Sequence, residues 1–432
     1  MAGENILVIG AGASGLMAAR ELAKAGQRVT ILEAREKTGG RILDIHDKDF
    51  PIPVMLGAEF IHGNMGLTIS LLKEAGIAYH PIAGKSYNIQ HGKLVPYNVY
   101  SNYWPDFMAK IQLAEEDISL SDFLAEHFSG EKYESLRESV NAFVEGYDAA
   151  DPDKVSVHSL RSEWEQDENQ QYRIEGGYGK LISYLAQQCL KTGVSILTEK
   201  VVSHFNWSEG FVEAITSSGE RFSASKAIIT LPLGVLQIKD GSLGFVNFTP
   251  PLPIRMGAVR AMGYGSVIKV SLYFKTAFWE EEALDAGFIF SREIIPIWWT
   301  QLPDKVAVLT GWLAGPEAEK QKKKSDEQII NMALLSVANI FNKNLKQVTG
   351  DLIKGHALNW GSSPFSRGAY AYTTVAQPNA HNILGDPVEN TLFFSGEATY
   401  NGPHGGTVEA ALVSGKAVAG KVLIPELDKK FS

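Results

Sequence analysis

Three glycines near the start of the chain have the types and spacing of a phosphate-binding turn. Gly10, Gly12 and Gly15 form the pattern GxGxxG directly after the apolar residues 6–9 and before apolar residues at helical spacing. In this context the first glycine permits a sharp turn, the second lets the backbone approach a pyrophosphate, and the third allows close packing of helix on strand. The helix N-terminus also favours phosphate charge. The candidate dinucleotide contacts are Gly10, Gly12, Ala13, Ser14 and Gly15.

An acidic residue at the end of the next apolar run narrows the choice of dinucleotide. Residues 29–32 predict a second buried strand, and Glu33 follows it directly. A carboxylate there can accept hydrogen bonds from both ribose hydroxyls and repels a 2′-phosphate, so NADP is disfavoured. Glu33, with Ala34 beside it, is therefore a second candidate contact. NAD and FAD both remain open at this point.

A lysine inside an apolar run is the third candidate for chemistry. Lys269 stands between Ile268 and Val270 in the segment GYGSVIKVSLYF, whose composition predicts a buried strand. A buried lysine is costly without a partner and tends to have a lowered pKa, which suits proton transfer or the activation of oxygen. The alternative is a lysine that reaches solvent from an edge strand.

The order of predicted elements places these features in an α/β fold. Residues 5–32 predict a strand–helix–strand unit, residues 105–168 predict mostly helices, and apolar β-rich runs return from residue 195 onward. Residues 390–423 again predict a strand, a Gly-rich turn and a helix. We expect a Rossmann-like dinucleotide-binding domain, with a parallel sheet and helices, interleaved with a second domain of mixed sheet plus helices.

Composition limits the class of protein. The chain has 432 residues, 45% of them hydrophobic, and a formal net charge of −9, which disfavours nucleic acid as a partner. No apolar run is long enough for a membrane span, and the start of the chain lacks the features of a signal peptide. The single cysteine, Cys189, excludes a disulfide framework and a thiolate metal cluster. We expect a cytoplasmic protein without a bound metal.

The segment EAREKTGGRI, which follows the second predicted strand, distinguishes between NAD and FAD. It resembles the corresponding segment of the flavin-containing amine oxidase superfamily, of the monoamine and polyamine oxidase type. The resemblance implies that Gly39, Gly40 and Arg41 lie under the pyrophosphate of FAD and that Arg35 lies near the adenosine end. It also implies an FAD domain built from residues 1–75, 172–236 and 380–432, and a substrate domain built from residues 76–171 and 237–379.

Further matches are spread over almost the whole chain. MLGAEFIHG is similar to the family segment that passes the flavin ring, in the version closest to polyamine oxidases, and LTEKVVSHF and SGEATYNGPHGGTVEAALVSG match two other flavin-binding segments. The resemblance implies contacts of Gly57 and Ala58 with the isoalloxazine, of the Val201 backbone with adenine, of Gly396 and Glu397 with the ribityl and pyrophosphate groups, and of a helix beginning at Thr407 and Val408 with the flavin C2 carbonyl.

The same resemblance implies which residues lie beside the reacting part of the flavin. Lys269 matches a family lysine that contacts flavin N5 through water, and Trp360 and Tyr370 match a tryptophan beside N5 and a tyrosine on the substrate side. In some members two aromatic residues face each other there, but here Thr407 takes the second position and leaves the cage half open. Ala369 takes the place of a cysteine that bonds flavin in some relatives, so we expect non-covalent FAD.

Two residues in GAEFIHG bear on the substrate. Amino-acid oxidases of the superfamily place an arginine near this segment for the substrate carboxylate, whereas this chain offers Glu59 and His62, which favour a polyamine. His62 either binds or protonates an amine or packs beneath the flavin, and Glu59 either meets the amine or holds backbone groups or a flavin edge. Four further acids either line an entrance for a long cation or form a solvated helix face: Glu145, Asp148, Glu163 and Glu165.

These observations predict an FAD-dependent oxidase that converts an amine, with a polyamine favoured, to an imine and reduces O2 to hydrogen peroxide. One alternative is another oxidase of the superfamily or a carbon–carbon desaturase. A second is a flavin-binding regulatory protein without turnover. Histone demethylation is disfavoured because the chain lacks an inserted helical tower and a recognisable chromatin-binding module. The oligomeric state stays open.

Overall fold

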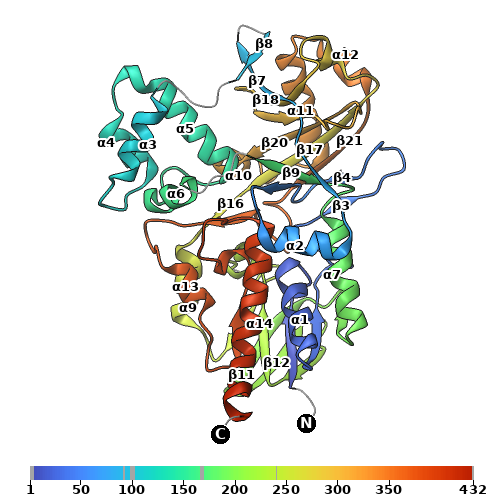
Figure 1. Ribbon diagram of the computed structural model, residues 1–432, viewed down its shortest axis with the longest axis vertical. Coiled ribbons are helices and arrows are strands. Elements are labelled where there is room, and N and C mark those ends of the chain that lie inside the picture. The colour runs from blue at the N-terminus through green and yellow to red at the C-terminus, as the bar shows by residue number, and fades with distance from the viewer. Residues whose placement is uncertain (1–3, 91–92, 98–102, 166–169, 240, 431–432) are drawn as a thin grey trace.

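The computed structural model describes residues 4–90, 93–97, 103–165, 170–239 and 241–430. Figure 1 shows a lower half in which the two ends of the chain lie close together, an upper half with a large sheet, and a group of helices at one side. No helix of the described ranges has both the length and the apolar character needed to span a membrane.

A five-stranded parallel sheet forms the centre of the lower half. Its order is β10 (Ser195–Leu197), β2 (Arg28–Leu32), β1 (Asn5–Ile9), β14 (Lys226–Ile229) and β23 (Leu392–Phe394). The strands are rich in Ile, Leu and Val because both faces of a parallel sheet are covered. Ile6 and Val8 face one hydrophobic core, and Leu7 and Ile9 face another. The predicted α/β fold with a parallel sheet is confirmed.

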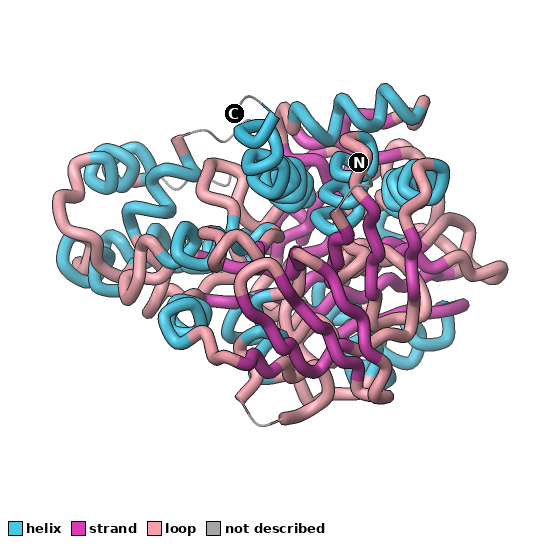
Figure 2. Tube along the Cα trace, turned by 90° about the horizontal axis from the view of Figure 1, so that it is seen from below, coloured by secondary structure: helices cyan, strands magenta, loops and turns pink. Residues whose placement is uncertain are grey.

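Different layers cover the two faces of this sheet. One face packs against α1 (Ala13–Lys24), α2 (Gly66–Ala75), α7 (Gly179–Lys191) and α14 (Val408–Lys430). The other packs against a sheet of order β13 (Arg221–Ala224), β12 (Phe211–Thr216), β11 (Val202–Ser208) and β15 (Asn247–Thr249), and against α8 (Leu233–Leu236), α9 (Pro253–Ala261) and α13 (Ala380–Gly385). Seen from below, the strands lie at the centre of this half with helices beside them (Figure 2).

The beginning and the end of the chain pack closely in this half. Helices α1 and α14 lie side by side (Figure 1), and a Cβ at Gly415 of α14 would stand 2.3 Å from the Ser14 carbonyl oxygen. A buried row of hydroxyls also joins them, since Ser395 Oγ lies 2.8 Å from both Ser14 Oγ and Ser414 Oγ. The last segment of the chain is thereby fixed beside the glycine-rich turn. The predicted division into two domains remains a prediction.

A mixed sheet of seven strands dominates the upper half. Its order is β21 (Leu352–Asn359), β17 (Val267–Phe274), β20 (Val308–Ala314), β19 (Ile297–Trp299), β18 (Ala286–Phe290), β7 (Lys85–Gln90) and β8 (Lys93–Pro96). Helices α10 (Gly315–Lys320), α11 (Asp326–Ile340) and α12 (Leu345–Asp351) and the short η2 (Phe278–Glu281) accompany it. Lys269 lies on β17, which pairs with β20 and β21 on its two sides. The edge-strand alternative for this lysine is therefore wrong.

The helical group at the side of the molecule fits the predicted helical stretch. It consists of α3 (Trp104–Gln112), α4 (Leu120–His127), η1 (Glu131–Tyr133), α5 (Glu134–Tyr147) and α6 (Val157–Trp164). Their apolar faces meet in a separate core that includes Phe107, Phe123, Val140 and Leu160. The prediction is confirmed for the described part of residues 105–168, and residues 166–169 lie outside the described ranges.

Small sheets connect the two halves. One has the order β5 (Phe60–His62), β9 (Gln171–Ile174) and β6 (Tyr79–Pro81), and two others pair β16 (Gly263–Gly265) with β22 (Tyr370–Tyr372) and β3 (Asp44–Ile45) with β4 (Val54–Met55). The short η3 (Glu397–Thr399) follows β23. In the first sheet Phe60 pairs with Arg173, so the GAEFIHG segment and an arginine far along the chain are adjacent.

Candidate functional site

A cavity of about 1570 Å³ lies where the parallel sheet, the mixed sheet and the helical group meet. Its volume exceeds the range of about 300–1,000 Å³ typical of small-ligand sites, which suits a dinucleotide together with a substrate. The predicted candidates that line it are Gly10, Gly12, Ala13, Ser14, Glu33, Ala34, Arg35, Gly40, Arg41, Gly57, Ala58, Glu59, His62, Val201, Lys269, Trp360, Tyr370, Gly396, Glu397, Thr407 and Val408. Gly15, also predicted, is not among the residues that line the cavity.

The start of α1 can hold a phosphate group. Gly12 is the N-cap residue, its backbone is extended, and it provides no side-chain cap. The first turn of α1 also carries no acidic residue, so its backbone N–H groups are not neutralised by the helix itself. These donors and the positive end of the helix dipole fit a pyrophosphate that enters from the cavity.

Two glycines shape this turn in different ways. Gly10 has φ +108°, and a Cβ there would stand 2.6 Å from Thr230 Oγ1. A Cβ at Gly15 would stand 2.0 Å from the Gly10 carbonyl oxygen, a distance no side chain tolerates. Gly15 therefore permits the close approach of α1 to the turn, the packing role that the sequence predicts for it.

Glu33 is fixed at the end of β2. Its Oε2 accepts a hydrogen bond from the Ala11 N–H at 2.7 Å, and its Oε1 accepts one from the Arg35 N–H at 2.9 Å. Each carboxylate oxygen can accept more than one hydrogen bond, so the group retains acceptor capacity. The carboxylate is buried at the cavity wall, where ribose hydroxyls would meet it.

Two arginines stand at the same end of the cavity and are held by neighbouring groups. Arg41 Nη1 lies 2.7 Å from Glu397 Oε1, an ion pair between segments 356 residues apart. Arg35 donates to Ser366 Oγ at 2.8 Å, and its guanidinium lies 6.0 Å from the centre of the Trp360 ring. The structure thus brings together Arg41, predicted under the pyrophosphate, Arg35, predicted near the adenosine end, and the predicted Trp360. Their contacts with FAD remain predictions.

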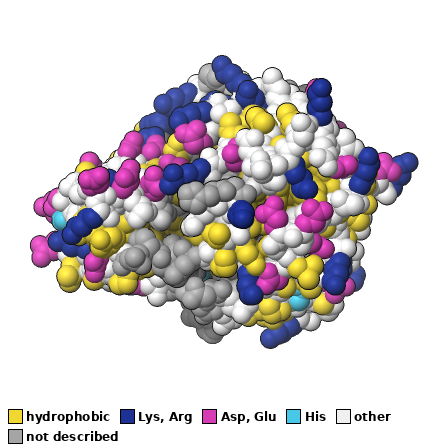
Figure 3. Space-filling view, turned by 90° about the horizontal axis from the view of Figure 1, so that it is seen from above, with side chains coloured by type: hydrophobic (Ala, Val, Ile, Leu, Met, Phe, Trp, Pro, Cys, Tyr) yellow, Lys and Arg dark blue, Asp and Glu magenta, His cyan; other side chains and the backbone are white. Residues whose placement is uncertain are grey.

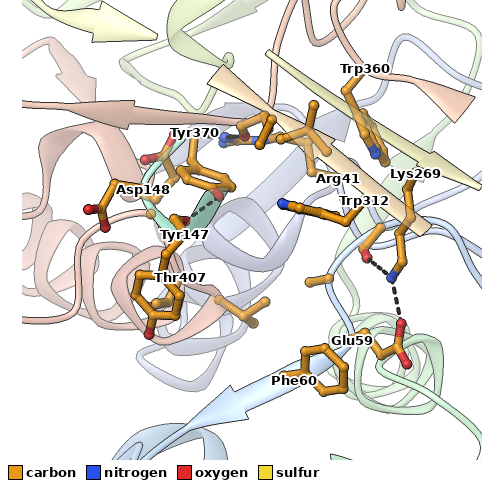
Figure 4. Close-up of a pocket in the computed structure, with 18 of the residues that line it drawn as sticks. Arg41, Glu59, Phe60, Tyr147, Asp148, Lys269, Trp312, Trp360, Tyr370 and Thr407 are labelled. Carbon is orange, nitrogen blue, oxygen red and sulfur yellow. Dashed lines mark hydrogen bonds and ion pairs between the residues drawn. The ribbon is translucent and has the colours of Figure 1, made fainter. Parts of the chain in front are cut away.

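A buried charge cluster surrounds Lys269. Its Nζ lies 2.6 Å from Glu59 Oε2 and 3.1 Å from the Gly57 carbonyl oxygen, as Figure 4 shows. The other carboxylate oxygen of Glu59 accepts hydrogen bonds from Arg173 Nη2 at 2.9 Å and from Trp299 Nε1 at 3.0 Å. Lys269 is 1% exposed and Glu59 5% exposed. Two cations therefore share one carboxylate in the cavity wall.

The two partners of this pair are shifted by burial and by each other. Burial lowers the pKa of Lys269 below its ordinary value, although the nearby Glu59 charge works in the opposite direction. Burial disfavours the ionised form of Glu59, but the charges of Lys269 and Arg173 outweigh burial and lower the pKa of this carboxyl. An ionised Glu59 is thus the group that compensates a lysine in an apolar strand.

Aromatic side chains with satisfied polar atoms form another part of the wall. The Tyr370 O–H donates to the Tyr147 carbonyl oxygen at 2.6 Å, Trp360 Nε1 donates to the Leu56 carbonyl oxygen at 2.9 Å, and Trp312 Nε1 donates to the Gly146 carbonyl oxygen at 2.8 Å. Figure 4 shows the three rings around the cavity. Burial, followed by the charge of Asp148, raises the pKa of Tyr370, so its phenol is neutral.

The helix that ends the chain begins at the cavity. As predicted, α14 starts at Val408, and Thr407 caps it because Thr407 Oγ1 accepts a hydrogen bond from the Ala410 N–H at 3.1 Å. Glu409 then accepts hydrogen bonds from the Leu67 and Thr68 N–H groups at 2.8 and 2.7 Å. Glu409 therefore caps α2 from another helix and joins the two helix starts.

His62 and three of the four acids considered for cation binding line the cavity. His62 packs edge-on against Tyr147 with ring centres 5.3 Å apart, and burial lowers its pKa to about 4, so the ring is neutral at pH 7. Glu145, Asp148 and Glu163 line the same cavity. Glu165 is exposed and not among the lining residues, so it forms part of a solvated surface.

Residues of the site that sequence reasoning missed include Arg173, Trp299 and Trp312. Arg173 lies in a strand next to apolar Ile174, which was a usable signal of a buried charge. The two tryptophans lie in strands, where aromatic residues are ordinary core residues, so no local signal separates them from the rest.

Comparison with known proteins gives the family. A sequence model of the family described as flavin containing amine oxidoreductase matches residues 13–423. The chain is 27% identical to the human lysine-specific histone demethylase 2, with 97% of this chain and 53% of that protein covered. It is 29% identical to polyamine oxidase 2 of Arabidopsis thaliana, with 96% of this chain and 87% of that protein covered.

Solved structures support the same fold. A triple mutant of putrescine oxidase matches with a TM-score of 0.80 at 21% identity, and 98% of this chain and 99% of that chain are covered. The chain spans about half the length of several histone demethylases that it matches. The predictions of the superfamily, of a flavin cofactor and of an enzyme acting on amines are confirmed by the family match. The chain belongs to the flavin-containing amine oxidoreductase family.

Proposed function

We propose that the protein is an oxidase that holds FAD non-covalently, converts a polyamine or another primary or secondary amine to an imine, and reduces O2 to hydrogen peroxide. The observation that carries the proposal is the buried Lys269–Glu59 pair, which shares one cavity with the uncapped start of α1 and with an aromatic wall. When bound, FAD supplies the two-electron chemistry: it accepts a hydride equivalent from the amine and passes the electrons to oxygen.

Residues of this chain bind the cofactor, shape the cavity for the amine and supply a hydrogen-bond donor. The α1 turn, Glu33 and Arg41 fit the phosphates and the ribose, and Ala369, which lines the cavity, has no group that could bond the flavin. The rings of Tyr370 and Trp360 present rigid walls to an aliphatic amine. Lys269 offers a cationic hydrogen-bond donor that Glu59 holds in place. We also propose the division into an FAD domain and a substrate domain that the sequence predicts.

The protonation state of the substrate sets the expected pH dependence. An amine must lose its proton before it can give up a hydride from its α-carbon, and no strong base is needed if it binds unprotonated. Because His62 is neutral at pH 7, it does not repel a cation that approaches the cavity. We expect the rate of flavin reduction to rise with pH across the pKa of the amine, and a flat profile would contradict this step.

A second candidate function is the demethylation of a histone lysine. It is favoured by the matches to lysine-specific histone demethylases over 97% of this chain. Polyamine oxidases match a similar share of this chain. The chain covers 85% and 87% of the length of two of them, far more than its share of the demethylases. This higher coverage and the acids that line the cavity favour a small amine cation as the substrate over a histone lysine.

The single cysteine, Cys189, is buried, and we infer a cytoplasmic location from the lack of a disulfide framework.

The proposal is tested by an aerobic screen of the purified yellow protein for peroxide. Spermine, spermidine, 1,4-diaminobutane, an arylalkylamine and a methylated histone peptide are compared at equal concentrations. Peroxide with the aliphatic polyamines supports the proposal. Turnover of the histone peptide alone would support the second candidate. Flavin reduction without peroxide would indicate a dehydrogenase or a desaturase.

A further inference from the structure

We propose that Glu163 binds the distal ammonium group of an α,ω-diamine or polyamine whose other end reacts at the Tyr370 side of the cavity, so that Glu163 selects diamines over monoamines. The inference rests on the proposed amine oxidation and names the residue that sets its substrate class. It begins with the position of Glu163 near the end of α6, at the cavity wall.

Glu163 is an acid with no cationic neighbour among the residues that the structure describes. Its one described hydrogen bond comes from Ser159 Oγ and is long, at 3.4 Å. Burial raises the pKa of Glu163 to about 7, and the Ser159 hydrogen bond only partly opposes that shift, while no described Lys, Arg or His contributes. A carboxyl in this state gains most when a cation arrives, because the cation removes the cost of its ionisation.

Glu163 lies close enough to the aromatic wall for one extended aliphatic chain to reach both. A Cβ at Gly405 would stand 3.4 Å from Glu163 Oε1, and a Cβ at Gly406 would stand 2.9 Å from the Tyr370 ring. These glycines are consecutive, and consecutive Cα atoms are about 3.8 Å apart, so the carboxylate and the Tyr370 ring lie within about 13 Å of each other. An extended polyamine spans such a distance.

The surface on this side of the cavity has the right character for the methylene groups between two nitrogens. Phe143 stacks on Tyr147 with ring centres 5.2 Å apart and meets Trp164 edge-on at 5.7 Å, and all three line the cavity. An aromatic surface that ends at a carboxylate matches a chain that is apolar in its middle and charged at its end.

A second observation on the same wall also points to a ligand. Nδ1 of His62 is buried and has no hydrogen-bond partner among the described residues, and the His62 ring packs on Tyr147. A buried polar atom left without a partner is costly unless a bound group satisfies it. An amine nitrogen along the cavity would do so. The Glu163 carboxylate and His62 Nδ1 therefore offer two acceptors to the nitrogens of one bound polyamine.

The test compares Glu163→Gln with Glu165→Gln, a matched exposed acid two residues away. The apparent dissociation constants of 1,4-diaminobutane and butylamine are measured from the concentration dependence of anaerobic flavin reduction, and also by calorimetry on the oxidised holoenzyme. For Glu163→Gln we expect the diamine to bind about 10- to 100-fold more weakly, the loss typical of one charge-assisted contact, and butylamine to change less than about twofold. Glu165→Gln should change neither.

Equal effects on both amines, or equal effects of the two substitutions, would overturn the proposal. Flavin content and thermal unfolding show whether the variants fold, and Glu163→Asp, which keeps the charge, should recover part of the diamine affinity. If no amine reduces the flavin of the wild type, the proposed oxidation fails, and the calorimetric comparison still decides whether Glu163 binds the diamine.

Discussion

The Lys269 ammonium lies 2.6 Å from the Glu59 carboxylate although 210 residues separate them in the chain, and Arg173 lies 2.9 Å from the other oxygen of the same carboxylate. This buried cluster carries two cations and one anion. Removing Glu59 leaves two buried cations without a counterion, whereas removing Lys269 leaves the balanced Glu59–Arg173 pair, so the members of the cluster have separable and measurable effects.

Replacing Lys269 by methionine removes the cation but keeps the volume of the side chain. Glu59 still pairs with Arg173 in this variant, so we expect a folded protein that binds FAD. We expect flavin reduction by the amine, or its reoxidation by O2, to slow by about 100-fold or more, the effect of losing a positioned proton donor. Stopped-flow absorbance measures both half-reactions.

The matched control is Lys275→Met, since Lys275 is exposed just beyond β17 and contacts the Gly350 carbonyl oxygen. It should leave both rates unchanged. Wild-type rates in Lys269→Met would remove Lys269 from the proposed site.

Replacing Glu59 by glutamine leaves Lys269 and Arg173 buried without their counterion. We expect the free energy of unfolding to fall by about 3 to 5 kcal/mol. Adding Arg173→Gln removes one of these two cations, so the double variant should be less destabilised than the sum of the single variants. Urea unfolding of the four proteins gives the coupling. Additive losses would show that the cluster does not act as a unit.

Replacing Gly15 by alanine places a methyl group against the Gly10 carbonyl oxygen. The turn must then open, so we expect the variant to lose its FAD or fail to fold. Gly257→Ala is the control, because a Cβ there meets nothing within 4 Å in the middle of α9 and alanine favours a helix. Flavin absorbance per protein is the readout. A yellow Gly15→Ala protein of normal stability contradicts the described geometry of the turn.

Replacing Glu409 by alanine removes the cap that α14 provides for α2. Three hydrogen bonds are lost, two from backbone N–H groups and one from Thr68 Oγ1, and their buried donors remain. We expect a loss of about 2 to 3 kcal/mol in the free energy of unfolding. Glu134→Ala, at an exposed acid in the first turn of α5, should cost much less. Similar losses in both variants would argue against the interhelical cap.

The free energy of unfolding should depend on pH through the titration of His62. Burial lowers its pKa from 6.5 to about 4 in the folded protein. Between these values the unfolded chain binds more protons, so the free energy of unfolding should fall as the pH drops from 6.5 to 4, by at most about 3 kcal/mol. His62→Gln should flatten that slope. Chemical unfolding at several pH values tests this, and an unchanged slope would show that His62 is not the group responsible.

The sequence predicted the parts of the fold and the site that depend on local patterns. The glycine turn, the start of α14 and the burial of Lys269 each follow from residues close together in the chain. The role of Gly15 in close packing also followed from its place in the pattern. Such features are local because a turn or a helix start is decided by a few neighbouring residues.

The contacts between distant segments were beyond the reach of these patterns. Glu59 was a candidate from its segment, but its pairing with Lys269 and Arg173 depends on β5, β9 and β17 meeting in space. Acidic and basic side chains are both scattered over the face seen from above, so charge on the surface does not mark the cavity either (Figure 3). Only the packed structure separates Glu163, at the cavity, from Glu165, in solvent.

The most direct test is an anaerobic titration of the purified protein with an aliphatic polyamine, followed by the visible absorption of its flavin. We expect a yellow protein whose absorption is lost on addition of the amine and returns with O2, and a Lys269→Met variant that stays yellow far longer. A colourless protein, or a bound flavin that no amine reduces, would show that the protein is not an amine oxidase.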